Sequence, residues 1–61
     1  MEVINSFGFY DIVYVKYIQK YWVINKQQDV MEGEAASLPE ALALGEALNS
    51  SLTRFVLEGN E

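Results

Sequence analysis

The chain lacks the two residue types that most often build active sites and small metal centres. Its 61 residues include no cysteine and no histidine. A disulfide is therefore impossible, and the usual zinc ligands are absent. A nucleophile activated by histidine is also excluded, because a serine would need another base. Since no glycine-rich phosphate loop occurs either, we expect a protein that is not an enzyme and needs no cofactor or metal.

Basic residues are few, and they are unevenly distributed. Nine acidic residues stand against four basic ones, so the net charge is −5. Residues 1–28 carry three lysines and two acids, whereas residues 29–61 carry one arginine and seven acids. The acidic half disfavours phosphate backbones and favours a basic partner, mainly through the encounter rate. Acidic side chains that merely keep a small domain soluble would explain the same charge.

Long uninterrupted apolar runs are missing too. The most apolar stretch, residues 7–24, contains Asp11, Lys16, Gln19 and Lys20, which would be costly to bury in a bilayer. Glu2 replaces the basic start of a secretory leader. We therefore expect a cytoplasmic protein that does not contact membranes, located in the host cytoplasm if it is viral.

What the chain does contain is enough apolar surface to fold. Hydrophobic residues make up 51% of the sequence and aromatic residues 13%, which argues against disorder. A domain of this size buries only about 60% of the surface that its unfolded chain exposes, so its stability should be marginal. Self-association is the remaining way to add buried surface, and we expect a homodimer.

The clearest predicted element is a C-terminal helix over about residues 38–57. Ser37 and Glu40 have the spacing of a capping box, and Pro39 in the first turn costs no intrahelical hydrogen bond. Gly45 is unfavourable within a helix, so we expect either a kink or close contact with a ring such as Trp22. Ser50, Glu46 and Arg54 lie opposite an apolar stripe formed by Ala41, Leu44, Gly45, Leu48, Leu52, Phe55 and Val56.

Residues 2–35 are predicted to form three or four antiparallel strands. β-Branched and aromatic residues dominate residues 9–24, and their alternation predicts a strand over residues 12–18. Residues 3–9, 21–24 and 30–35 are the other candidates, residues 25–29 are a polar hairpin loop, and Gly33 indicates a bulge or an edge. The predicted class is α+β in a single domain over residues 1–61. An all-α helical hairpin is the alternative, because Tyr10, Tyr14, Tyr17 and Tyr21 are spaced as on one helical face.

Two surfaces are candidates for binding a protein partner. An unpaired sheet edge is one of them. The other is acidic, and could meet a basic groove on a nucleic-acid-processing host protein by imitating nucleic acid. Its Glu32 and Glu34 alternate by two, so we expect them on one face of a strand, where they are also formal candidates for acid–base catalysis or weak cation binding. A solvated strand face explains them equally well. The acidic set comprises Asp29, Glu32, Glu34, Glu40 and Glu46.

A third group of residues interleaves aromatic rings with lysines. Such a sheet face can stack on single-stranded nucleic acid. Alternatively, the rings form the core and a dimer contact while the lysines extend to solvent. The net charge favours the second interpretation, so nucleic acid is not the expected partner. The group comprises Tyr14, Lys16, Tyr17, Lys20, Tyr21 and Trp22.

Residues 20–52 resemble a known small-domain pattern. A polar turn and a second strand follow the run Tyr21-Trp22-Val23-Ile24, and Glu34-Ala35-Ala36-Ser37-Leu38-Pro39-Glu40-Ala41 then leads into Leu48. This is similar to the strand-turn-strand-helix pattern of HicB-type antitoxins and related short domains. The resemblance implies a half-domain, related in shape to the double-stranded RNA-binding fold, that engages a partner protein. The DNA-binding extension of many antitoxins does not occur here, so a regulator of transcription is not implied.

From these features we expect a small acidic accessory or regulatory protein of the kind that phages and mobile elements encode. It would modulate a host protein by occupying its surface. The alternatives are a homo-oligomeric assembly subunit and a single-stranded nucleic-acid binder.

Overall fold

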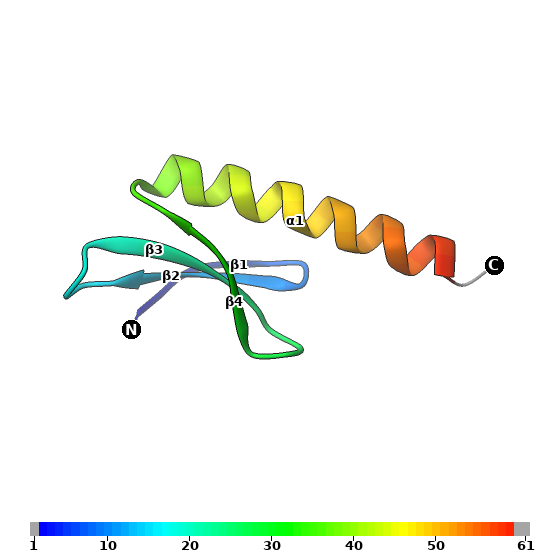
Figure 1. Ribbon diagram of the computed structural model, residues 1–61, viewed down its shortest axis with the longest axis horizontal. Coiled ribbons are helices and arrows are strands. Elements are labelled where there is room, and N and C mark those ends of the chain that lie inside the picture. Colours follow the sequence, from blue (N-terminus) through cyan, green and yellow to red (C-terminus); the bar gives the residue numbers. More distant parts are fainter. Residues whose placement is uncertain (1, 60–61) are drawn as a thin grey trace.

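A computed structural model describes residues 2–59 of the chain, and the side chains of residues 2–53. Four strands are followed by one helix (Figure 1). The fold is therefore α+β, as predicted, and the all-α alternative is wrong. The elements are β1 (Glu2–Phe7), β2 (Tyr10–Val15), β3 (Lys20–Asn25), β4 (Val30–Ala35) and α1 (Leu38–Gly59).

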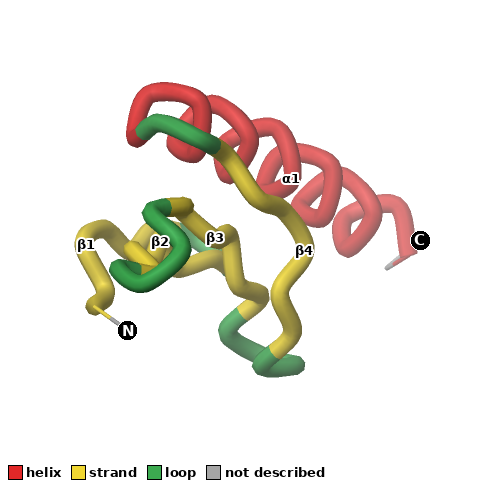
Figure 2. The backbone as a smooth tube through the Cα atoms, turned by 60° about the vertical axis from the view of Figure 1, so that its left-hand side comes forward, coloured by secondary structure: helices red, strands yellow, loops and turns green. Residues whose placement is uncertain are grey.

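The sheet is an antiparallel meander in the order β1-β2-β3-β4. α1 lies along one side of this twisted sheet, where it contacts β2, β3 and β4 (Figure 2). The opposite side carries no further element within the described residues. The two sides of the sheet therefore have different environments, and the alternation of each strand decides which side chains enter each one.

The main core lies between α1 and the sheet. Its buried members are Tyr10, Ile12, Val23 and Ala41. Ile12 pairs with Val23 across β2 and β3, so both side chains point toward α1. Partly buried apolar residues complete this core, namely Phe7, Phe9, Tyr21, Ala35, Leu42, Leu44, Leu48 and Leu52.

α1 buries the predicted apolar stripe. It ends at Gly59, slightly later than the predicted residue 57. Glu46 on the opposite side is exposed. The side chains of Arg54, Phe55 and Val56, which were also assigned to the two faces of the helix, lie outside the described residues. The stripe residues that are buried or half-buried are Ala41, Leu44, Gly45, Leu48 and Leu52.

The helix cap forms at the predicted residues but differs in one hydrogen bond. The Glu40 amide donates to Ser37 Oγ at 3.4 Å, as in a capping box. The Glu40 carboxylate accepts a bond from the Ser37 hydroxyl at 2.8 Å, whereas the carboxylate of a capping box accepts from the amide of the cap residue. The Ala41 amide donates to the Ser37 carbonyl at 3.0 Å and closes the first turn. Side-chain caps of this type contribute about 1 kcal/mol.

Gly45 allows α1 to approach the sheet closely. A Cβ atom at this position would lie 2.8 Å from Phe7 Cζ and 3.2 Å from Ile12 Cδ1. The predicted close contact with a ring is therefore confirmed, but the ring belongs to Phe7. Trp22 lies on the other side of the sheet, because its neighbour in β3 points toward α1.

Asn49 of α1 attaches the β1–β2 turn to the helix, and Gly8 in that turn leaves room for its side chain. The φ of Gly8, 55°, is positive, as the first central position of a type II′ turn requires. The Asn49 side chain of α1 occupies the space that a Cβ atom would need, and its Oδ1 accepts a hydrogen bond from the Phe9 amide at 2.9 Å. A residue in the middle of α1 therefore fixes the position of the first hairpin.

The β2 strand is shorter than predicted. Alternation predicts a strand to Ile18, but β2 ends at Val15 and residues 16–19 form a loop. Val15 pairs with Lys20, which is where the ladder between β2 and β3 ends. The prediction for residues 16–18 is therefore wrong, because a turn can form without the glycine, proline, asparagine or aspartate that usually indicates one.

Each outer strand contains a bulge. In β1 the pairing shifts between Val3 and Asn5, which makes Ile4 the extra residue. In β4 the partners pass from Gly33 to Met31, which makes Glu32 the extra residue. The irregularity predicted near Gly33 is therefore confirmed. Bulges in outer strands disfavour the addition of another strand, so these edges are poor templates for pairing.

Candidate functional site

The β2–β3 loop presents apolar side chains at its tip. The Ile18 amide donates to the Val15 carbonyl at 3.3 Å, and the Gln19 amide donates to the Lys16 carbonyl at 3.2 Å. Gln19 has a φ of 56°, which returns the chain to β3. At the tip, 84% of the Tyr17 surface and 39% of the Ile18 surface are exposed. The turn therefore holds an aromatic ring and an aliphatic side chain in solvent.

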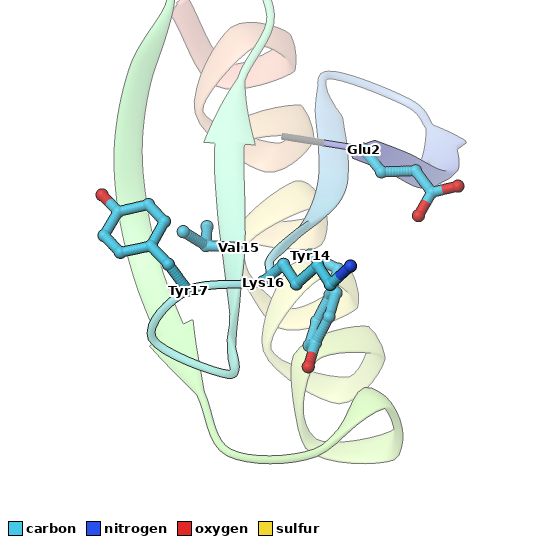
Figure 3. Close-up of a pocket in the computed structure, with 5 residues that line it drawn as sticks. All are labelled: Glu2, Tyr14, Val15, Lys16 and Tyr17. Carbon is cyan, nitrogen blue, oxygen red and sulfur yellow. The ribbon is translucent and has the colours of Figure 1, made fainter.

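An open cavity of about 500 Å³ lies at the base of this loop. Figure 3 shows its lining side chains, most of which come from the end of β2 and the loop. Glu2, Lys16 and Tyr17 are exposed, so the cavity is a depression in the surface and does not enclose a ligand. It suits a side chain or a base presented by a larger partner. The lining residues are Glu2, Tyr14, Val15, Lys16 and Tyr17.

Tyr14 also contacts Tyr21 on the adjacent strand. The two residues are cross-strand partners, and their ring centroids lie 4.9 Å apart with an interplanar angle of 47°. Both rings are half-buried. Aromatic pairs with this geometry stabilise a sheet, so Tyr21 has a structural role, whereas Tyr14 also lines the cavity.

The side of the sheet opposite α1 forms a second candidate surface, which we call the open face. Its apolar residues are Val3, Val13, Val15, Trp22, Ile24 and Met31, its charged residues are Asp11, Lys20 and Glu34, and Ser6 is its uncharged polar residue. Val13 and Val15 are buried by their neighbours and form its floor. Val3 and Met31 are 57% and 45% exposed. The open face is therefore largely apolar, with charges at separate positions.

Trp22 lies in the middle of the open face. Its Nε1 donates a hydrogen bond to the carboxylate of Glu34 at 2.9 Å, across the β3–β4 pair. The indole ring is half-buried. Because the only polar group of the ring already has a partner, covering the ring with another surface would leave no donor unsatisfied.

The six residues predicted as one aromatic and basic face are thus divided into three groups. Tyr14 and Tyr21 contact each other on the helix-facing side, Lys20 and Trp22 lie on the open face, and Lys16 and Tyr17 belong to the loop. The cavity reunites Tyr14, Lys16 and Tyr17 and adds Glu2 and Val15. No local sequence signal indicated Glu2, because β1 reaches this end of the sheet only through its register with β2.

Two members of the predicted acidic set point to opposite sides of the sheet. Glu32 accepts hydrogen bonds from Tyr10 and Asn25, which lie on the helix-facing side. Glu34 accepts its bond from Trp22 on the open face. The prediction that Glu32 and Glu34 share one face is therefore wrong. The bulge is the reason, because an extra residue reverses the alternation of the strand.

The other acidic residues are distributed over separate elements. Glu40 belongs to the cap of α1, Asp29 has a φ of 57° at the end of the β3–β4 loop, and Glu46 is exposed on α1. Glu32, Glu34 and Glu40 already accept hydrogen bonds within the chain. In the described part of the chain, no three acidic side chains converge as a metal site would require.

A buried polar network that the sequence did not reveal holds the β3–β4 loop. Asn25 is 4% exposed, and its Oδ1 accepts bonds from the Gln27 and Gln28 amides at 2.9 and 3.2 Å. Its Nδ2 donates to Glu32 Oε2 at 2.9 Å, and the Tyr10 hydroxyl donates to Glu32 Oε1 at 3.3 Å. Burial, followed by the charge of Glu32, raises the pKa of Tyr10 above its usual value. This network stabilises the structure, and both carboxylate oxygens of Glu32 accept hydrogen bonds within it.

No protein-family model, curated protein or solved structure matches this chain. The strand-turn-strand-helix order over residues 20–52 is present as β3, β4 and α1. The resemblance to HicB-type antitoxins stays a prediction. Within the described residues, no helix combines the length and apolarity needed to cross a membrane.

Proposed function

We propose that this protein is a small accessory protein that binds a partner protein through the tip of its β2–β3 loop. The exposure of Tyr17, at 84%, is the observation that carries the proposal. Tyrosine is enriched among the residues that dominate binding energy at protein interfaces. A ring that a hydrogen-bonded turn holds outside the core contributes little to the stability of its own domain, so it is available as an anchor.

The surroundings of the tip indicate the chemistry of the partner surface. The Tyr17 ring and the adjacent Ile18 require an apolar pocket on the partner. Lys16 and Lys20 flank the tip, and the cavity beside it is lined by apolar and charged side chains, including Glu2. A partner segment that places an apolar side chain in the cavity and a carboxylate near Lys16 would match these groups.

This proposal keeps the regulatory role expected from the sequence but changes the contact surface. Binding to the tip would modulate a host protein by occupying its surface, as an accessory protein of a phage or mobile element does. The predicted acidic set is distributed over several elements, so it would act on encounter through the overall charge of the chain. An unpaired sheet edge was the other predicted surface, but both edge strands, β1 and β4, carry bulges, which makes strand addition the weaker mode of binding.

Capture of a partner from a lysate of the host tests the role of the tip. Wild-type protein is expected to retain a partner that Tyr17→Ala loses, with binding reduced at least about tenfold. Gln27→Ala is the matched control, because Gln27 is exposed in the other four-residue loop, residues 26–29. Urea unfolding should be similar for the three proteins, since neither side chain is buried.

Equal capture by wild type and Tyr17→Ala would contradict the proposal. Salt separates the two kinds of contact, because apolar anchoring survives high ionic strength and exposed charge pairing does not. Capture that disappears in high salt, and is equal in the two proteins in low salt, would assign binding to the acidic residues.

Single-stranded nucleic acid is the second candidate partner for the same site. The observation in its favour is that Lys16 and the exposed Tyr17 ring flank one open cavity, as a cation and a stacking platform would. Titration with oligonucleotides at low salt should then quench tyrosine fluorescence in wild type and much less in Tyr17→Ala. Absence of quenching in the wild-type protein excludes this candidate.

A further inference from the structure

We infer that the open face is a self-association surface, and that its occupant is a second copy of this chain related by a two-fold axis. The inference concerns a different surface from the loop tip, although Val15 and Lys20 border both. It concerns the face formed by Val3, Val13, Val15, Trp22, Ile24 and Met31, with Asp11, Lys20 and Glu34, that no element of the described residues covers.

The charges of the open face are arranged so that the face complements itself. The strand register places three rows across it. Lys20 and Val15 lie at the end near the β2–β3 loop, whereas Asp11 and Ile24 lie at the other end. The middle row contains Val3, Val13, Trp22 and Glu34. One end of the face therefore carries Lys20, the centre is mainly apolar, and the other end carries Asp11. Ser6 lies beside Asp11 at that end and accepts a hydrogen bond from Lys26 Nζ at 3.2 Å, so Asp11 is the acidic group there and Lys26 lies at its border.

A two-fold axis that runs along the middle row, across the strands, pairs opposite charges at both ends of the face. Rotation about this axis reverses the strand direction, so the Lys20 end of one copy lies over the Asp11 end of the other. Because the operation is symmetric, the same contact occurs twice. An axis parallel to the strands would instead bring the two Lys20 side chains together, and also the two Asp11 side chains. Charge therefore selects the first arrangement.

Water can be excluded from the centre of this dimer interface. Trp22 would pack near the axis, where its indole N–H is already bonded to Glu34. Val13 and Val15 present no polar groups. Two antiparallel sheets pack face to face at about 10 Å with strands inclined by about 30°. The dimer would then have four layers, with the two copies of α1 on the outside.

The area of the open face limits how tightly the two copies can bind. Four strands at about 4.8 Å spacing and six residues at about 3.3 Å rise give a footprint of about 400 Å² per copy. The two copies together would bury about 800 Å², which is less than the roughly 1,200 Å² of stable specific interfaces, so the dimer is expected to be weak, with a dissociation constant of about tens to hundreds of micromolar. The arrangement also brings the two Glu34 carboxylates near each other at the rim, which weakens the dimer.

Sedimentation equilibrium over a concentration series tests the inference with a matched pair of variants. Wild type is expected to show a monomer–dimer equilibrium. Met31→Glu places a charge on the open face, twice per dimer, and should weaken association at least about tenfold. Val30→Glu is the control, because Val30 is equally exposed at 47% but pairs with Asn25 on the other side of the sheet. It should leave the equilibrium unchanged.

Charge exchange tests the two-fold geometry itself. Lys20→Glu and Asp11→Lys should each weaken the dimer at low salt, and the double variant should restore it. Glu34→Gln should tighten the dimer, since it removes the repulsion and keeps an oxygen for Trp22. If the open face contacted an unrelated protein instead of a second copy, the double variant would not be expected to restore binding.

Two results would overturn the inference. One is a wild-type monomer throughout the micromolar range up to several hundred micromolar. The other is a dimer that Met31→Glu leaves intact. Neither result affects the loop-tip proposal, because Tyr17→Ala tests that surface separately. Circular dichroism of each variant confirms that loss of association is not loss of folding.

Discussion

At the scale of single residues, Gly45 shows how packing can outweigh helix propensity. Alanine is favoured over glycine within a helix by about 1 kcal/mol. The added Cβ atom of Gly45→Ala would, however, meet Phe7 Cζ at 2.8 Å. We expect the two effects to cancel or to leave a loss of up to about 1 kcal/mol, and Gly45→Val to destabilise the domain by about 1–3 kcal/mol. Urea unfolding measures both variants.

A double variant separates propensity from packing at this site. In the Phe7→Leu background the ring is absent, so Gly45→Ala should become stabilising relative to that background. Ala47→Gly, at an exposed position of α1, should lower stability by about 1 kcal/mol and reports the propensity term alone. If Gly45→Ala stabilises the wild-type chain by the full propensity difference, the close contact with Phe7 is not important.

Tyr10 makes stability depend on pH in the alkaline range. Burial and the Glu32 charge raise its pKa in the folded state above the unfolded value of about 10. The folded state therefore holds the proton more tightly, and this contribution is complete below about pH 10. It is lost as the pH rises through the folded pKa, with a slope of up to about 1.4 kcal/mol per pH unit.

Urea unfolding between pH 8 and pH 11 measures this slope. Tyr10→Phe should remove the Tyr10 part of it and lower stability at neutral pH by about 1 kcal/mol, because the bond to Glu32 is lost. Tyr17→Phe is the control, since its hydroxyl is in solvent in both states. An alkaline slope that is identical in wild type and Tyr10→Phe would show that Tyr10 does not cause it.

At the scale of elements, Asn25 connects β3, its following loop and β4. Asn25→Asp keeps the acceptor for the Gln27 and Gln28 amides but places a second carboxylate against Glu32. We expect a loss of about 1–3 kcal/mol at pH 7, measured by urea unfolding. Glu32→Gln in the same chain should recover much of that loss, because its amide can donate to the new carboxylate. Additive effects of the two substitutions would contradict this coupling.

The elements differ in how well the sequence predicts them. α1 was predicted nearly to its ends, since the cap at Ser37 and the 3.6-residue periodicity are both local signals. The β2–β3 loop was not predicted, because Lys16, Tyr17, Ile18 and Gln19 include no residue typical of turns. The loop exists because pairing between β2 and β3 ends at Val15 and Lys20, which is a property of two strands together.

The candidate surfaces were predicted less well for the same reason. Tyr14, Lys16 and Tyr17 were recognised, but not Glu2, which reaches the cavity through the register of β1. The bulge at Glu32 exists only when β4 pairs with β3, so the sequence could not indicate that Glu32 and Glu34 would separate. Residue type predicts chemistry here, whereas strand pairing decides which residues meet.

At the scale of the whole molecule, the chain has two small clusters of buried side chains on the two sides of one sheet. Tyr10, Ile12 and Val23 are covered by α1, whereas Val13 and Val15 are covered only by their neighbours on the open face. A domain of this size has little stability to spare. A second copy over the open face would bury Val3 and Met31, which are exposed in the monomer, so folding and association should be linked.

This linkage predicts a melting temperature that rises with protein concentration. A ligand that binds only the folded state stabilises it by mass action. Above the dissociation constant, a tenfold increase in concentration adds about 1.4 kcal/mol per dimer, or about 0.7 kcal/mol per protomer. For a domain of this size that corresponds to an increase of about 3–6 °C. Scanning calorimetry should show this increase for wild type and Val30→Glu, and a constant melting temperature for Met31→Glu. A wild-type melting temperature that does not change with concentration would separate folding from association and contradict the dimer.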